Sequence, residues 1–228
     1  LLACLFGYVT LSLKSEPVLA GIALNTLASG LTIFIIYYVT GEKGSTQSLM
    51  SPTLPNIHIP LLKDMPILGS ILSGHNFITY LGLLLTVVLA LFIYKTPTGL
   101  RIRSVGENPD AAKSIGIKVY KYKYIALIIA GALAGLGGSF MSMGYVSFFS
   151  KEMVAGRGFI GMAAESMGRG TPIGVLLSSL LFGAADSLAI RLQMLNLPVQ
   201  LIQTIPYVVT IIAIAIYSYS RTEKKISK

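Results

Sequence analysis

The chain has 228 residues, of which 54% are hydrophobic and only 12% are charged, and its mean hydropathy is +0.73. A soluble domain of ordinary composition has about a quarter of its residues charged, so this composition excludes that class and predicts an integral membrane protein. The formal net charge of +9 would suit a nucleic-acid-binding protein, but a membrane chain offers no soluble basic face, so the position of the charges predicts topology instead.

Several apolar runs are long enough to cross a bilayer, which needs about 20 mostly apolar residues. The earlier run Leu1–Leu13 is too short to cross and lacks the basic start of a signal peptide, so we expect it to be the end of a further span. The sequence therefore predicts an all-α, polytopic transmembrane helical bundle that forms a single domain over residues 1–228. The predicted spans are Val18–Val39, Phe77–Tyr94, Tyr124–Tyr145, Ile173–Ile190 and Val199–Tyr217.

The segment between the first two spans, Thr40–Asn76, contains four prolines, which interrupt regular structure. It also holds His58 and His75, the only histidines of the chain, and no acid or enclosed cleft is indicated beside them, so we expect no catalytic pair. The single Cys4 excludes an internal disulfide, and no spacing of Cys and His suggests zinc. We expect no catalytic residue, no metal and no cofactor in this chain.

The segment between the second and third spans, residues 95–123, is polar and strongly basic. Inter-span loops rich in Lys and Arg face the cytoplasm, so this segment is predicted to be a cytoplasmic loop. Because spans alternate in direction, the basic end of the chain falls on the same side, and the C-terminus is predicted to be cytoplasmic. The charged residues of the loop are Lys95, Arg101, Arg103, Lys113, Lys118, Lys121 and Lys123 against Glu107 and Asp110.

Within this loop, Gly106–Gly116 is predicted to contain one short helix. Asn108 is a good N-cap, Pro109 suits the first helical position, and Asp110 favours the positive end of the helix dipole. Gly116 can end the helix in the left-handed conformation. About seven helical residues are too few to be stable alone in water, so something must hold this helix in place.

The side chains of this helix favour docking into a groove of another protein. Ala111, Ala112 and Ser114 are small, Ile115 adds an apolar contact, and the lysines nearby can steer the helix toward an acidic partner. The alternative is a solvated loop that lies on lipid headgroups, which would explain the lysines but not the defined start and end of the helix.

The third span contains Gly131 and Gly135 at GxxxG spacing, with Gly138 on the same face, a pattern that permits close approach of another membrane helix. A nucleotide-binding glycine loop is the alternative, but Phe140 stands where its third glycine should be, and no strand precedes it. The pattern G-x-x-x-x-G-K-[ST] is also absent, so this chain is not predicted to hydrolyse ATP itself.

The stretch SFFSKEMVAGRGFIGMAAESMGRGTP is a poor ordinary span because it combines charges with several glycines. We expect an extended segment followed by a short helix at about Phe159–Met167, shielded from lipid by neighbouring spans. Such discontinuous helices often mark the route of a solute through a transporter, and they also occur as packing devices. The candidate residues of a translocation path are Asn25, Arg157, Glu165 and Asp186.

Each path candidate has a structural alternative. Glu165 and Arg169 stand at i and i+4, in the order that favours a helical ion pair. Asp186 and Asn25 each lie in an otherwise apolar span, where a hydrogen bond to a neighbouring helix is a common role.

Several motifs follow one another in an order that resembles a known family. They are TPTGLRIRSVGENPDAAKSIGI, a Gly-rich span, MVAGRGFIGMAAESMGRGTPIG, LLFGAADSL and IPYVVTI, and they cover nearly the whole chain. Together they resemble the permease subunits of bacterial ABC importers of the ribose-transporter-like class, and they are most similar to the branch associated with nucleosides and simple sugars. Members of that family carry further N-terminal spans, so the resemblance implies that this chain is a fragment. Many members have an apolar residue where Glu165 stands, which weakens a general pore role for it.

The resemblance implies how the chain works with partners. In the family, a Gly-x-Asn-x-x-Ala-Ala pattern belongs to the cytoplasmic coupling loop that docks on the ATP-hydrolysing subunit. An ATP-binding subunit, a second permease subunit (a copy or a paralogue) and an extracellular solute-binding lipoprotein are the partners implied, in a bacterial plasma membrane. The residues assigned to coupling are Gly106, Asn108, Ala111, Ala112, Ile115 and Gly116.

These observations predict a membrane-spanning permease subunit of an ATP-driven importer for nucleosides or simple sugars, and not an enzyme. The alternative is a secondary transporter or channel driven by an ion gradient, which should need no docking helix and should carry acidic or proton-relay positions deep in several spans.

Overall fold

The computed structural model describes residues 1–49, 54–57, 73–192 and 208. They fall into two compact units, one ending at Ala155 and the other beginning at Gly156. Most of the described residues are helical, with one antiparallel pair of two-residue strands, β1 (Asn56–Ile57) and β2 (His75–Asn76). The predicted all-α class is therefore confirmed.

Four described helices are long and apolar enough to cross a membrane: Pro17–Thr40, Phe77–Lys95, Val119–Gly144 and Pro172–Arg191. They coincide with the first four predicted spans to within a few residues, which confirms a polytopic membrane protein. Apolar side chains are exposed around these helices, as expected for segments that face hydrocarbon or other helices rather than water. The fifth predicted span, Val199–Tyr217, lies outside the described residues.

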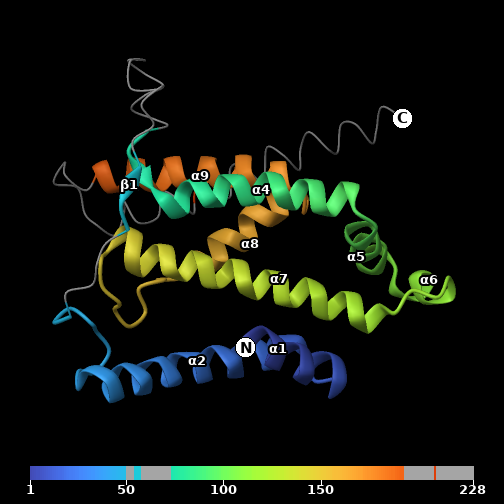
Figure 1. Ribbon diagram of the computed structural model, residues 1–228, viewed down its shortest axis with the longest axis horizontal. Helices are drawn as coiled ribbons and strands as arrows, with labels where there is room; N and C mark the ends of the chain where they lie inside the picture. Colours follow the sequence, from blue (N-terminus) through green and yellow to red (C-terminus); the bar gives the residue numbers. More distant parts are fainter. Residues whose placement is uncertain (50–53, 58–72, 193–207, 209–228) are drawn as a thin grey trace. The chain divides into compact units, whose positions relative to one another are not determined.

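The first unit begins with a short helix that continues into a wider, π-helical turn. In the unit, α4 and α7 run in opposite directions, and α5 and α6 connect them at the end away from the strands (Figure 1). The elements are α1 (Leu2–Gly7), η1 (Tyr8–Ser12), α2 (Pro17–Thr40), α4 (Phe77–Lys95), α5 (Pro97–Glu107), α6 (Pro109–Ser114), α7 (Val119–Ser139) and the π-helical turn η3 (Phe140–Tyr145).

Local chemistry explains where α2 begins and ends and where α4 begins. Pro17 occupies the first turn of α2, and Gly41 ends that helix in the left-handed conformation at φ +72°. The Asn76 side chain accepts a hydrogen bond from the Ile78 amide at 3.2 Å and caps α4. The ring of His75 packs edge-on against Tyr80, with 6.3 Å between the ring centroids, and His58 lies outside the described residues.

The glycines of α7 have a partner at one position. A side-chain carbon at Gly131 would collide with Ala3 of α1, so the predicted close approach of a helix is confirmed there. Tyr124, two turns earlier, packs over Gly7 and shares a hydrogen bond with Ser12 at 3.0 Å. A side-chain carbon added at Gly135 or Gly138 would meet nothing within 4 Å in the described part of the chain.

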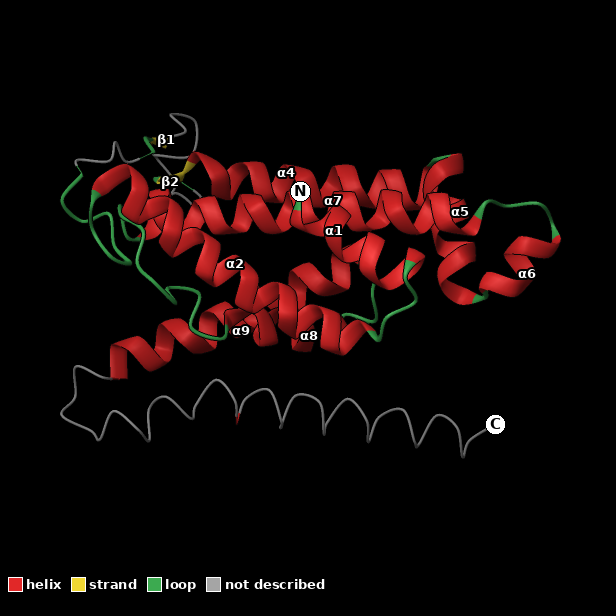
Figure 2. Ribbon diagram, turned by 90° about the horizontal axis from the view of Figure 1, so that it is seen from below, coloured by secondary structure: helices red, strands yellow, loops and turns green. Residues whose placement is uncertain are grey.

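The second unit contains α8 (Arg157–Met167) and α9 (Pro172–Leu192), which pack together (Figure 2). The predicted short helix is confirmed and begins at Arg157, two residues early, because Gly156 adopts φ +76° and starts it. The expected extended segment is limited to the bridge between Ser150 and Ser45, and residues 151–156 form turns instead.

The corner between α8 and α9 is closely packed. Gly168 and Gly174 contact each other through their backbones, so a methyl group on either would collide with the backbone on the other side of the corner. The Thr171 hydroxyl donates to the Gly168 carbonyl at 2.7 Å and accepts from the Gly174 amide at 3.2 Å. This double hydrogen bond caps the start of α9.

Candidate coupling site

The basic loop contains a helix that the sequence analysis did not predict. α5 begins at Pro97, and the Thr96 hydroxyl accepts from the Gly99 amide at 3.1 Å while it donates to the Phe92 carbonyl of α4 at 2.6 Å. A side-chain carbon at Gly99 would lie 2.6 Å from the Cα of Ile93, so the end of α4 and the start of α5 are in backbone contact. The Thr-Pro start is a recognisable helix signal, and it could have revealed α5.

The short helix α6 has the ends that the sequence predicts. The Asn108 side chain accepts from the amides of Asp110 and Ala111 at 3.1 and 3.0 Å, and Pro109 is the first helical residue. Gly116 follows the helix at φ +82°, and the Ile117 amide donates to the Ala112 carbonyl at 3.0 Å. α6 has six residues rather than about seven, and Gly106 belongs to the last turn of α5.

The chain's own core holds α6 on one side. Ala112 is 1% exposed and packs with Val105 of α5 and Tyr122 of α7. Four partly buried apolar residues surround this cluster: Ile102, Ile117, Val119 and Ile125. The short helix is thus anchored by its own subunit, and Ala112 serves that anchor rather than an outer surface.

The opposite side of α6 is bare. Ala111, Lys113 and Ser114 are exposed, and Ile115 at the end of the helix is 75% exposed. Ile115 and the small side chains beside it leave this side of the helix apolar and uncovered within the described part of the chain. We call Ala111, Ser114 and Ile115 the outer face of α6.

Two arginines of α5 contact two different helices. Arg101 donates from Nη1 to the Tyr122 hydroxyl of α7 at 2.9 Å, and its guanidinium carbon lies 5.9 Å from the centre of that ring. Arg103 lies 4.9 Å from the ring centre of Tyr94, in the last turn of α4, and 3.6 Å from Glu107. A cation over an aromatic face contributes about 0.5–1 kcal/mol at an exposed site.

The four candidate path residues fall on three helices. Asn25 is exposed on α2 of the first unit, whereas Arg157 and Glu165 are exposed on α8 and Asp186 is partly buried on α9 of the second unit. The structure brings Glu165 and Asp186 onto adjacent helices. Among the described residues, no group of three or more His, Cys, Asp or Glu side chains could hold a metal ion.

The helical pair expected from Glu165 and Arg169 does not have helical geometry. α8 ends at Met167, and Arg169 adopts φ +55°, so the two residues are not one turn apart on a continuous helix. The reason is Gly168, whose lack of a side chain permits the tight corner into α9. The predicted end of this helix at Met167 is confirmed, and the expected i,i+4 geometry fails because Arg169 lies beyond that end.

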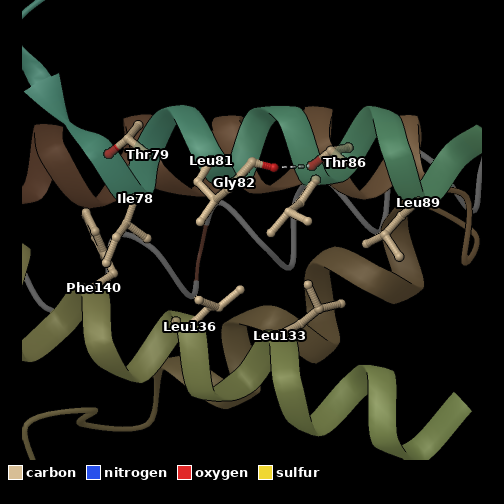
Figure 3. A pocket seen from close by; sticks show the side chains of 11 residues that line it. Ile78, Thr79, Leu81, Gly82, Thr86, Leu89, Leu133, Leu136 and Phe140 are labelled. Carbon is tan, nitrogen blue, oxygen red and sulfur yellow. Dashed lines mark hydrogen bonds between the residues drawn. The ribbon is translucent and has the colours of Figure 1, made fainter. Parts of the chain in front are cut away.

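An apolar cavity of 450 Å³ lies between α4 and α7 (Figure 3). No charged side chain lines it, and the Thr86 hydroxyl, one of its polar groups, donates to the Gly82 carbonyl within α4 at 2.9 Å. Such a lining suits hydrocarbon better than a polar solute. Its apolar side chains are Ile78, Leu81, Leu85, Leu89, Leu133, Leu136 and Phe140.

Residues 1–214 match the protein family described as the permease component of branched-chain amino acid transport systems. The chain belongs to this permease family. It is 34% identical to the nucleoside ABC transporter permease protein NupC of Lactococcus lactis, over 95% of this chain and 69% of NupC. It is 36% identical to the guanosine ABC transporter permease protein NupQ of Bacillus subtilis, over 94% of this chain and 68% of NupQ.

A third relative of the permease is the putative glucose ABC transporter permease protein TsgC13 of Haloferax volcanii. The identity is 31%, over 97% of this chain and 72% of TsgC13. No solved structure is significantly similar to the chain.

Membership of this family shows in outline what the permease does. It is a multi-pass membrane subunit of an ABC transporter, and such permeases are not enzymes themselves. Membership also implies a separate ATP-binding subunit and a substrate-binding protein. The family resemblance inferred from the sequence motifs is confirmed.

Proposed function

We propose that this permease carries nucleosides inward, with simple sugars as the next class of solute. The support is the pair of relatives named for nucleosides and for guanosine, at 34% and 36% identity over nearly the whole chain. The relative named for glucose, at 31% identity, supports the second class. Energy comes from ATP hydrolysed by the partner subunit, since this chain has no phosphate-binding loop.

We also propose that the outer face of α6 docks on the ATP-binding subunit. The observation that carries this proposal is the two-sidedness of the helix: Ala112 is buried against its own subunit, whereas Ala111 and Ile115 are exposed beside it. Because its own subunit already holds α6 on one side, the helix can transmit a force applied to its outer face without first being ordered. This lowers the entropic cost of docking.

The six coupling residues divide into three roles in this proposal. Asn108 and Gly116 define the ends of α6, and Gly106 leads the chain out of α5 into the cap. Ala112 anchors the helix inside. Ala111 and Ile115 make the contact with the ATP-binding subunit.

The proposed setting is a bacterial plasma membrane in which residues 1–228 form one transmembrane permease domain. Residues 95–123 and the C-terminus face the cytoplasm, because basic residues gather in the loop that contains α6. A second permease subunit, a copy or a paralogue, completes the path through the lipid bilayer, and an extracellular lipoprotein delivers the solute. Neither nucleic acid nor a cofactor takes part.

The polar residues of the proposed path are Asn25, Arg157, Glu165 and Asp186. Charged groups inside a membrane protein are costly unless they face polar surroundings, so these side chains are placed along a route for polar solutes. The short helix α8 contributes two of them and follows Gly156, and short helices interrupted by glycine are common near the solute sites of transporters.

Uptake by reconstituted vesicles tests the proposed function. Vesicles that contain this permease with its partner subunits should accumulate radiolabelled guanosine only when ATP is present and the ATP-binding subunit is catalytically intact. Accumulation driven by a proton or sodium gradient without ATP would instead support a secondary transporter and overturn the proposal.

The docking face has its own test. Ala111→Glu should leave membrane insertion and folding intact and reduce co-purification of the ATP-binding subunit at least tenfold, because a charge would be buried without a partner. Ala111→Ser is the matched control, since it keeps a small side chain and should retain the complex. Undiminished recovery of the ATP-binding subunit with Ala111→Glu would refute docking through this face.

A further inference from the structure

We propose that Arg101 and Arg103 join α5 to two spans, so that movement of the coupling helix α6 reaches α7 and α4 together. We call the contact of Arg101 with α7 and the contact of Arg103 with α4 the two arms of α5. This inference rests on the proposed docking of α6. It assigns to the two arginines a positioning role that is separate from docking, because neither belongs to the outer face of α6.

The positions of the arginines on α5 set the directions of the arms. Residues two apart on an α-helix are separated by about 200°, so Arg101 and Arg103 leave opposite sides of α5. Each contacts a tyrosine in a different candidate span: Tyr122 near the start of α7 and Tyr94 near the end of α4. One helix of 11 residues is thereby joined to both spans that flank the loop.

Tyr122 connects the arm to the coupling helix itself. Tyr122 is 8% exposed and packs in the cluster with Ala112 of α6 and Val105 of α5, while its hydroxyl accepts the hydrogen bond of Arg101 at 2.9 Å. A displacement of α6 is therefore passed to α5 and α7 through one buried side chain, that of Tyr122. Close-packed apolar contacts resist compression, and the directional hydrogen bond from Arg101 adds a restraint on sliding.

The other arm reinforces a joint that is already stiff. The Thr96 hydroxyl bonds both to the Phe92 carbonyl of α4 and to the Gly99 amide of α5, and Gly99 touches the backbone of Ile93. Arg103 adds the contact with Tyr94 one turn further along. Its ion pair with Glu107 is 3.6 Å long between exposed side chains and contributes little.

The experiment compares transport per ATP in the complete complex reconstituted into vesicles. Tyr122→Phe keeps the buried ring and removes only the acceptor of the Arg101 hydrogen bond. Arg101→Met and Arg103→Met remove one arm each, and Lys121→Met is the matched control, because Lys121 is an exposed cation next to Tyr122. The readouts are recovery of the ATP-binding subunit, the rate of ATP hydrolysis, and radiolabelled guanosine accumulated per ATP hydrolysed.

We expect Tyr122→Phe and Arg101→Met to retain the ATP-binding subunit and to lower guanosine accumulated per ATP by threefold or more, with the double variant no worse than either alone. Arg103→Met should also lower it, whereas Glu107→Gln and Lys121→Met should not. If Arg101→Met does not fold, Tyr122→Phe decides for the contact with α7, since the phenylalanine ring fits the same space, and Arg103→Met decides for the contact with α4.

Three results would overturn the inference. They are an unchanged ratio in Tyr122→Phe, an equal fall in Lys121→Met, and loss of the ATP-binding subunit in Tyr122→Phe, which would place the pair in docking instead. Failure of the proposed function is a different outcome, because the unaltered permease would then either not retain the ATP-binding subunit or accumulate no guanosine in response to ATP.

Discussion

Ala111 and Ala112 are adjacent and chemically identical, yet one is exposed and the other is 1% exposed. From the sequence both were assigned to docking, because a helix of six residues is too short for its apolar pattern to reveal which side is inward. The difference depends on Val105 and Tyr122, which come from two other helices and surround Ala112. The docking face could therefore be located to one helix from the sequence, but not to one side of it.

Two glycines of α5 give a prediction at the same scale. Gly99→Ala should destabilise the permease by about 1–3 kcal/mol, because the added carbon would collide with the backbone of Ile93 rather than with a flexible side chain. Gly106→Ala should stabilise it by up to about 1 kcal/mol, since the site is open and alanine favours a helix. Thermal unfolding in detergent should move in opposite directions; equal shifts would show that the α4–α5 corner is looser than described.

Among the elements, the apolar spans and the capped helix α6 were predicted, whereas α5 and the partner of Gly131 were not. Hydropathy located four spans because each needs about 20 apolar residues, and the Asn-Pro start with Gly116 located α6. α5 was missed because its amphipathic 11 residues are polar enough to read as loop. Gly131 was correctly expected to pack against a helix, but its partner α1 lies far away in sequence, where no local pattern could identify it.

The cap of α6 gives a prediction for that element. Asn108→Ala removes the acceptor of two amide hydrogen bonds and should destabilise the helix by about 0.5–2 kcal/mol. Amide hydrogen exchange of residues 109–117 should accelerate, while exchange in α7 stays unchanged. Asn108→Asp preserves the acceptor and should leave exchange slow; acceleration in both variants would mean that capping is not what orders α6.

For the whole molecule, the charge distribution predicts which loops face the cytoplasm. In a background with Cys4→Ser, a single cysteine placed by Ser114→Cys on α6 should react with a membrane-impermeant maleimide only in inside-out vesicles. Glu42→Cys, just after α2, should react only from the opposite side, because one span separates the two faces. Labelling of both positions from the same side would invert or abolish the proposed topology.

The tight corner at Thr96 limits how the length of α4 can vary. An extra residue inserted in the middle of α4 would rotate everything after it by about 100° and advance it by about 1.5 Å relative to the preceding half of the helix. Tyr94 and Arg103 would turn as one body, since the corner between them is closed, but Arg101 would swing away from Tyr122 on α7. Length changes in this span should therefore be tolerated in near-whole turns and rejected one residue at a time.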